Sequence, residues 1–148
     1  HLIERIEHFG STAVPQLAAK PIIDILVGVT SLADTQDQIV PILEAQGYEY
    51  FWRPTFGNDC PPWYAWFIKR DLRTHQRTHH IHMVEPDFTE HWDRLLFRDY
   101  LIRHPEAAAH YQALKMDLAT QFPQDRIRYA QGKRALIEQM TSLARAEC

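Results

Sequence analysis

The feature that constrains this chain most is a carboxylate, Asp24, inside its longest apolar run, residues 21–29. The run is rich in β-branched residues, so residues 20–29 are predicted to form a strand. Successive side chains of a strand point to opposite faces, which places Ile22, Asp24 and Leu26 on one face. An ionised carboxylate among such neighbours is costly unless it is paired, hydrogen-bonded or bound to a cation. The fold must therefore supply Asp24 with a partner.

Two interpretations of Asp24 are open. In the first, the carboxylate is structural and accepts a salt bridge or a backbone N–H group. In the second, it is a metal-binding or catalytic group. A Gly10-Ser11 turn lies just upstream, and this favours the second interpretation. Such a turn between a strand and a short helix exposes backbone N–H groups that can hold a phosphate.

The first half of the chain has the pattern of strands and turns, and the second half that of helices. Besides residues 20–29, we expect strands at residues 2–9, 48–53, 63–70 and 77–85. Expected helices cover residues 31–46, 88–103, 105–122 and 125–145, with Gly47 and Asp125 as caps and Pro105 in a first turn. A loop is expected at residues 55–62, with its turn at Gly57-Asn58-Asp59.

This order of elements predicts an α+β fold in a single domain, residues 1–148. Its sheet part covers about residues 1–86 and its helical part about residues 87–148. We expect the sheet to be mixed and the helices to cover one of its faces.

Histidine is unusually frequent, with nine residues, four of them between His75 and His82. On a strand, His80 and His82 share a face, while Ile81 and Met83 take the opposite one. Two parallel imidazoles can converge on one metal ion or one phosphate. The alternative is that both face solvent on an open sheet. His79 lies on the Ile81 side, and we expect it to hydrogen-bond at the rim.

Two Tyr-x-x-x-Lys motifs, Tyr111–Lys115 and Tyr129–Lys133, lie on the expected helices. Lys133 is in register with an apolar helical stripe. It either extends its ammonium group to solvent or points to an anionic ligand between sheet and helices. Further positive charge is available from Arg98, Arg126, Arg128 and Lys20, the last of these at the mouth of the site.

Composition excludes several classes of protein. A 148-residue chain that is 45% hydrophobic can bury a core and is not disordered, and two cysteines do not form a disulfide framework. A net charge of −3 gives no support to nucleic-acid binding, and no apolar run is long enough to cross a membrane. No secretory signal is visible, so we expect a cytoplasmic protein. Nothing in the sequence activates Cys60 as a nucleophile.

Aromatic residues cluster between the expected strands: Phe51, Trp52, Trp63, Tyr64, Trp66 and Phe67. Most are expected in the core or on the sheet face. The alternative is that one of them stacks on a nucleobase or acyl group.

Several segments together resemble the GrpB family, which is grouped with the nucleotidyltransferase superfamily. Residues 8–15 (HFGSTAVP) and 17–25 look like its first signature, and residues 78–84 look like its histidine signature. Residues 97–101 and the two Tyr-x-x-x-Lys helices look like its C-terminal part. Members usually begin with a further N-terminal segment, which we expect to be missing from a chain that starts at His1.

The resemblance implies a nucleotidyltransferase-like α+β fold. In active members of that superfamily, Gly-Ser after the first strand binds nucleotide phosphates and three strand carboxylates hold divalent metal. Here Gly10, Ser11 and Asp24 match, Leu26 occupies the second carboxylate position, and a histidine replaces the third. One carboxylate with imidazoles suits Mn or Zn better than Mg.

The site that follows has two groups of residues looking into one cavity between sheet and helices. Asp24, His80 and His82 are the expected catalytic and metal-binding residues. The expected nucleotide-binding residues are Gly10, Ser11, Thr12, Lys20, Arg98, Lys115, Tyr129 and Lys133. The implied activity is transfer of a nucleotidyl or phosphoryl group to an acceptor, with a divalent metal (Mn, Mg or Zn) as cofactor.

Two alternatives remain beside this activity. The first is a non-catalytic module that binds a nucleotide or coenzyme A, because family members occur fused to a dephospho-coenzyme A kinase domain. The second is a phosphoester hydrolase that needs only one metal ion.

Overall fold

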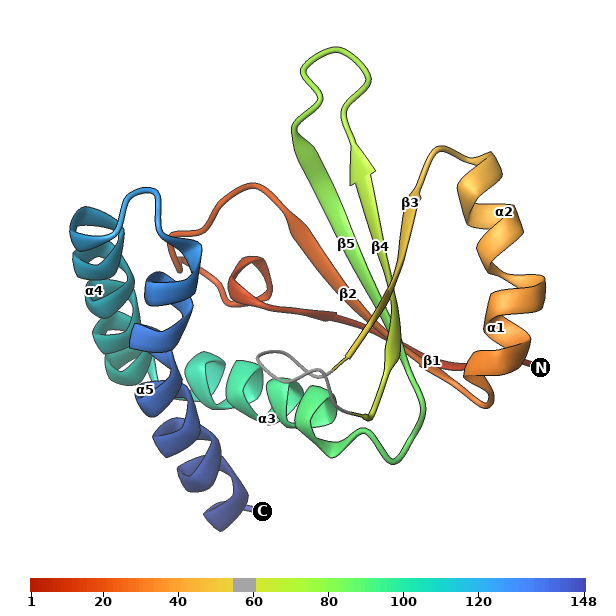
Figure 1. Cartoon of the computed structure of the whole chain (residues 1–148). Helices are drawn as coiled ribbons and strands as arrows, with labels where there is room; N and C mark the ends of the chain where they lie inside the picture. Colours follow the sequence, from red (N-terminus) through yellow and green to blue (C-terminus); the bar gives the residue numbers. More distant parts are fainter. Residues whose placement is uncertain (55–60) are drawn as a thin grey trace.

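The computed structural model describes residues 1–54 and 61–148 and has an α+β architecture (Figure 1). In the described chain, the strands form one five-stranded sheet in the order β1-β2-β5-β4-β3. β2 and β5 are parallel, and the other neighbours are antiparallel. The predicted mixed sheet is therefore confirmed. The strands are β1 (Ile3–Phe9), β2 (Ile23–Val29), β3 (Glu49–Arg53), β4 (Tyr64–Arg70) and β5 (Arg77–Val84).

β2 begins later than the predicted strand at residues 20–29. The Ile22 N–H donates to the Lys20 carbonyl oxygen at 2.8 Å, and this tight turn precedes the strand. Lys20 and Ile22 therefore lie before β2, and only Asp24 and Leu26 of the predicted triplet belong to it. The predicted turn Gly57-Asn58-Asp59, like Cys60, lies outside the described residues.

The predicted helix at residues 31–46 is two helices, α1 (Leu32–Gln38) and α2 (Val40–Ala45). Pro41 explains the break, because proline has no N–H group and its ring displaces the carbonyl group four residues earlier. Gly47 ends α2 as predicted, with a φ of 91° that suits glycine.

The second half is helical, as predicted. It contains α3 (Thr89–Arg103), α4 (Pro105–Gln121) and α5 (Arg126–Ala146). Pro105 stands in the first turn of α4, where its missing N–H group costs nothing. Asp125 caps α5 by accepting the Arg128 N–H. Among the described residues, no helix is long and apolar enough to cross a membrane.

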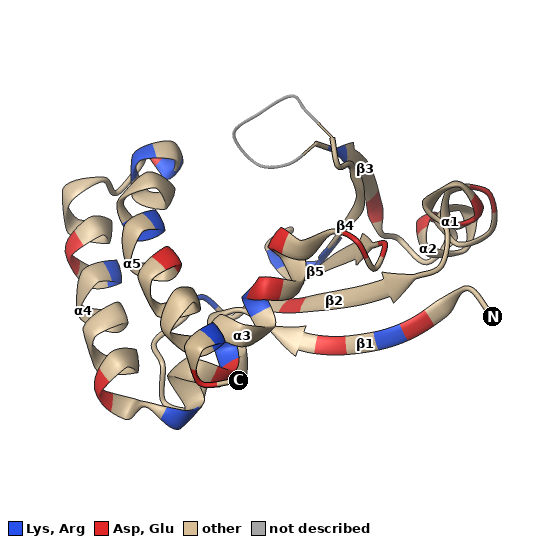
Figure 2. Cartoon of the chain, turned by 90° about the horizontal axis from the view of Figure 1, so that it is seen from below, with Lys and Arg blue, Asp and Glu red and all other residues tan. Residues whose placement is uncertain are grey.

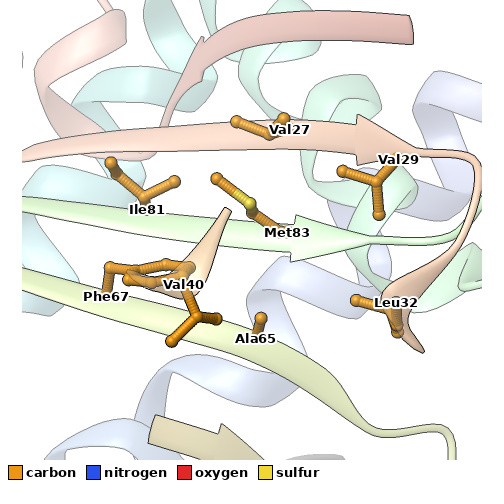
Figure 3. Close-up of a cluster of buried hydrophobic side chains, with 8 residues drawn as sticks. All are labelled: Val27, Val29, Leu32, Val40, Ala65, Phe67, Ile81 and Met83. Carbon is orange, nitrogen blue, oxygen red and sulfur yellow. The ribbon is translucent and has the colours of Figure 1, made fainter. Parts of the chain in front are cut away.

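Helices cover both faces of the sheet, so the expectation of one covered face is wrong. α1 and α2 lie on one side, and α3 to α5 lie on the other (Figure 1). The reason is that the central strands are apolar on both faces. On the first face, side chains of β2, β4 and β5 pack against Leu32 and Val40; the strand members are Val27, Val29, Ile81, Met83, Ala65 and Phe67 (Figure 3).

The opposite face holds the second core cluster, beneath α3. Leu26 of β2 is fully buried there. It packs with Phe9, Tyr64, Val84, Phe88 and Leu95, and Trp66 and Trp92 border the cluster. A third cluster joins Val14 to α3, α4 and α5 through Tyr100, Leu101 and Tyr111. The helical half is thereby anchored over the face that carries Asp24.

Gly28 of β2 allows α3 to approach the sheet. A Cβ atom there would lie 2.9 Å from Cη2 of Trp92, whose indole N–H donates to the Glu85 carbonyl oxygen at 3.2 Å. We expect Gly28→Ala to lower the free energy of unfolding by about 1–3 kcal/mol, because overpacking displaces the ring. Urea denaturation measures the loss. Adding Trp92→Leu should recover part of it; purely additive effects would contradict this contact.

Candidate functional site

Asp24 and His80 are neighbours across the parallel pair β2–β5. The register aligns Asp24 with His80 and Leu26 with His82. His80 Nδ1 lies 3.1 Å from Asp24 Oδ1. Asp24, His80 and His82 all line one cavity of about 870 Å³ between the sheet and helices α3 and α5. The predicted sharing of one cavity by these three residues is confirmed.

Gly10 leaves the space that the Asp24 carboxylate occupies. It has a φ of 75°, a conformation that favours glycine. A Cβ atom at Gly10 would lie only 2.6 Å from Asp24 Oδ2. The turn after β1, which continues into a short 3-10 helix at Ser11–Ala13, therefore closes against the carboxylate. Gly10 and Ser11 both line the cavity.

His82 lies deeper than His80. It is only 8% exposed, stacks on Tyr64 at 5.5 Å between ring centroids, and has Nδ1 3.2 Å from Nε2 of His91 on α3. Burial lowers the pKa of His82 well below its usual value and that of His91 to about 2. Both rings are therefore neutral at pH 7. The sequence reasoning missed His91, whose helix position gives no cue to a strand partner.

The side chains do not form a ready-made metal site. Among residues 1–54 and 61–148, no group of three or more His, Cys, Asp or Glu side chains could hold a metal ion. Asp24 and His80 already pair with each other, and His82 Nδ1 is engaged by His91. Leu26, at the second carboxylate position, is fully buried. The donor set does not fit Mn, Mg or Zn as it stands, and the metal remains a prediction.

Three basic side chains that line the cavity, Arg53, Arg94 and Lys133, form no ion pair with a carboxylate among the described residues. Arg94 of α3 lies over the Phe9 ring, 5.8 Å from its centroid, and burial lowers its pKa. Lys133 of α5 lies over the Tyr129 ring at 4.7 Å. Burial lowers the Lys133 pKa, and the nearby charges of Arg94 and Lys20 lower it further. Sequence reasoning placed Lys133 at the cavity but missed Arg94, and Tyr129 does not line the cavity.

Other basic side chains of the cavity are compensated. Arg98 donates to Glu7 at 3.0 Å and to Asp99 at 2.8 Å, and these bonds raise its pKa despite burial. Arg134 pairs with Glu138 at 3.3 Å, and Arg145 pairs with Asp93. Arg98 thus lines the cavity as predicted, but its charge is already neutralised.

The remaining predicted binding residues lie around the cavity rather than in its wall. Lys115 Nζ donates to Ser11 Oγ at 2.8 Å and to the Ala18 carbonyl oxygen at 3.0 Å. Thr12 Oγ1 is engaged by His8 Nε2 at 2.8 Å. Lys20 does not line the cavity, and its charge lowers the pKa of Lys133. Arg126 and Arg128 are exposed at the start of α5 and do not line the cavity.

Two members of the predicted aromatic cluster, Tyr64 and Trp66, reach the cavity wall. Trp66 lies beneath the Arg53 guanidinium, with 4.6 Å from Cζ to the ring centroid. His80 Nε2 and Trp66 Nε1 are buried and have no hydrogen-bond partner among the described atoms. Tyr64 and Phe67 belong to the two cores, as expected for most of the cluster.

Charge on the helices is mixed. Figure 2 shows basic and acidic positions interspersed along α3, α4 and α5 rather than gathered in one basic stripe. Within the cavity, the basic side chains without an ion-pair partner among the described residues are Arg53, Arg94 and Lys133. A small anion fits such a pattern better than a long polyanion does.

Together the fold and the site define an α+β protein whose mixed sheet holds an acid–imidazole pair beneath helices that carry Arg94 and Lys133. This description is consistent with the nucleotidyltransferase-like superfamily. A family model described as "GrpB protein" matches residues 1–143. The chain therefore belongs to the GrpB family, and the resemblance noted in the sequence is confirmed.

Similar proteins agree with this family. The "UPF0157 protein PA4798" of Pseudomonas aeruginosa is 40% identical over 143 residues, covering 95% of this chain and 55% of that protein. The crystal structure of the "conserved protein GrpB" from Enterococcus faecalis superposes with a TM-score of 0.77 at 36% identity, covering 96% of this chain and 80% of that one. This chain spans about half the length of the Pseudomonas relative.

A third relative is named for an enzymatic activity. The "Dephospho-CoA kinase" of Mycobacterium bovis is 30% identical over 150 residues. The match covers 90% of this chain but 37% of that protein.

The buried histidine pair makes stability depend on pH. Both folded pKa values lie below the unfolded value of about 6.5, so the unfolded state binds more protons and stability is lost as pH falls below 6.5. Each histidine contributes roughly 1.4 kcal/mol per pH unit. We expect His91→Gln to reduce the loss of unfolding free energy between pH 6 and 5 by the contribution of about one histidine. Urea denaturation at several pH values measures this slope. The exposed control His110→Gln should keep the wild-type slope, and equal slopes for both variants would contradict the neutral pair.

Proposed function

We propose that the cavity binds a nucleotide-sized phosphorylated ligand, with its phosphates against Arg94 and Lys133. The observation that carries this proposal is the presence of two partly buried cations in one cavity without carboxylate partners among the described residues. Burial disfavours both charges, and they also repel each other. A bound phosphate would remove both penalties through charge-assisted hydrogen bonds.

The size and shape of the site suit such a ligand. A cavity of about 870 Å³ lies within the range of small-molecule sites. Its wall includes Trp66 and Arg53, whose planar groups can stack on a nucleobase. His80 Nε2 and Trp66 Nε1 are buried and have no hydrogen-bond partner in the part of the chain that the structure describes, so they favour a ligand with polar edges.

We further propose that the protein transfers a nucleotidyl or phosphoryl group from this ligand to an acceptor. Asp24 contacts His80 and interacts electrostatically with both Arg94 and Lys133, so it is close to where the phosphates would bind. As a carboxylate it can take the acceptor's proton directly, or it can fix the tautomer of His80. Arg94 and Lys133 would stabilise negative charge that develops on the phosphoryl oxygens.

A second candidate function is binding without turnover. Leu26 in the second carboxylate position favours it, because the chemistry of the superfamily uses two carboxylates there. The dephospho-CoA kinase relative makes coenzyme A a ligand to test alongside nucleotides. A single-metal phosphoester hydrolase would need a ligand set that the described side chains do not present.

The binding proposal predicts that ATP or coenzyme A raises the melting temperature in a saturable way. Arg94→Met and Lys133→Met should each weaken the affinity by about 10- to 100-fold, because each removes a charge-assisted bond of about 1.5–3 kcal/mol. Isothermal titration calorimetry measures the change. The matched control is Arg128→Met, also on α5 but outside the cavity. Equal losses in all three variants would contradict a local phosphate site.

The transfer proposal predicts a specific role for Asp24. Asp24→Asn keeps the size of the side chain but removes its basicity, so turnover should fall by about 10²–10⁴-fold with little loss of ligand affinity. Phosphorus NMR of ATP incubated with the protein, with and without Mn, detects the product. Asp117→Asn, on the exposed face of α4, controls for net charge. Saturable binding without product in the wild type would favour the second candidate function.

A further inference from the structure

We propose that Ser11 is a nucleophile and Lys115 its general base, in a pair that attacks the phosphorus of an anionic phosphoester or phosphoanhydride. This goes beyond ligand binding, but the anionic substrate class rests on the proposed function. Ser11 lines the cavity, and its Oγ lies 2.8 Å from Lys115 Nζ. Hydrogen-bonding contact between nucleophile and base is the first geometric requirement of such a pair.

The base is held in place by a third group. Lys115 Nζ also donates to the Ala18 carbonyl oxygen at 3.0 Å. One turn earlier on α4, Gln112 Oε1 accepts the Ala18 N–H at 2.9 Å, so the segment after Ser11 is fixed to α4 at two points. A neutral Lys115 amine can donate to Ala18 and accept the hydroxyl proton of Ser11 at the same time.

The surroundings favour the neutral amine. Burial lowers the pKa of Lys115 to about 8, and the charge of Lys133 on α5 contributes. No carboxylate among the described residues forms an ion pair with Lys115 to restore its charge. About one molecule in ten is then neutral at pH 7. The other titratable neighbour is Tyr111 on the same helix, whose pKa burial raises, so it stays protonated and can donate to Ser11.

The proposed step balances without an external reagent. Ser11 Oγ forms a bond to phosphorus, its proton passes to Lys115 Nζ, and the bond from phosphorus to the leaving oxygen breaks. Lys115 then returns the proton to that leaving oxygen. Water or an acceptor alcohol later attacks the phosphorus of the phosphoserine and loses its own proton to Lys115. The bond from phosphorus to Ser11 Oγ then breaks, and Lys115 returns the proton to Oγ.

A simpler role for the same contacts is structural, since Lys115 and Gln112 tether residues 11–18 to α4. The two roles differ in chemistry. A tether needs only a cation of sufficient length, whereas a base needs an amine that loses its proton near neutral pH. Arginine satisfies the first requirement and not the second.

A fluorophosphonate probe tests the pair directly, because a serine attacks its phosphorus and displaces fluoride. We expect intact-protein mass spectrometry to show one adduct and peptide mapping to place it on Ser11. The labelling rate should rise with pH through about 8 as Lys115 loses its proton. Ser142 lines the same cavity but has no lysine partner among the described residues, so it should stay unlabelled.

Lys115→Arg is the matched variant, and we expect it to lower the labelling rate at least about 100-fold while the melting temperature stays close to that of the wild type. No adduct on wild-type Ser11, an unchanged rate in Lys115→Arg, or a rate that is flat from pH 6.5 to 9.5 would overturn the proposal. Should the variant not fold, the wild-type pH profile decides alone.

The probe carries no nucleotide, so the two proposals can fail separately. Protection of Ser11 by ATP or coenzyme A would support both. Labelling that neither compound slows would support the Ser11–Lys115 pair and count against the proposed ligand. Binding of ATP without any labelling of Ser11 would support the proposed ligand and count against the Ser11–Lys115 pair.

Discussion

The parallel pairing of β2 with β5 places Asp24 directly beside His80 and Leu26 beside His82. Parallel neighbours require a crossover connection, and here the crossover carries α1, α2, β3 and β4. Both faces of the central strands are therefore covered, and the polar pair lies on the face that the C-terminal helices enclose. A shift of this register by one residue would turn both Asp24 and the buried Leu26 to the opposite face of the sheet.

The enclosed face combines two kinds of electrostatic compensation. Arg98, Arg134 and Arg145 each have a carboxylate partner, so their charges are balanced within the protein. Arg94 and Lys133 instead face the cavity without an ion-pair partner among the described residues; Asp24 attracts both at longer range, and Glu90 also attracts Arg94. Retaining such charges costs stability. A ligand that supplies the missing negative charge is the simplest physical reason for this arrangement.

The sequence predicted much of this architecture because local signals were strong. The apolar run around Asp24 predicted a strand, and alternation within each strand correctly put Asp24 on the face of Leu26 and His80 on the face of His82. Gly47, Pro105 and Asp125 marked helix ends through backbone chemistry that depends only on near neighbours.

The sequence predictions failed where contacts between distant segments of the chain determine the structure. Single-sequence periodicity did not weigh Pro41 against an amphipathic helix, and it did not reveal that both sheet faces are apolar enough to need cover. Arg94 and His91 were missed because α3 brings them to the cavity and to His82 only when it packs across the sheet. Arg94 lies four residues before Arg98, so helical spacing alone could have placed both on one face.

A co-crystal structure with a non-hydrolysable nucleoside triphosphate tests the central claim most directly. The account predicts phosphate oxygens within hydrogen-bonding distance of both Arg94 and Lys133, with Asp24 beside them and the base toward Trp66. Phosphates bound elsewhere on the surface, with the two cations still facing an empty cavity at saturating nucleotide, would contradict it.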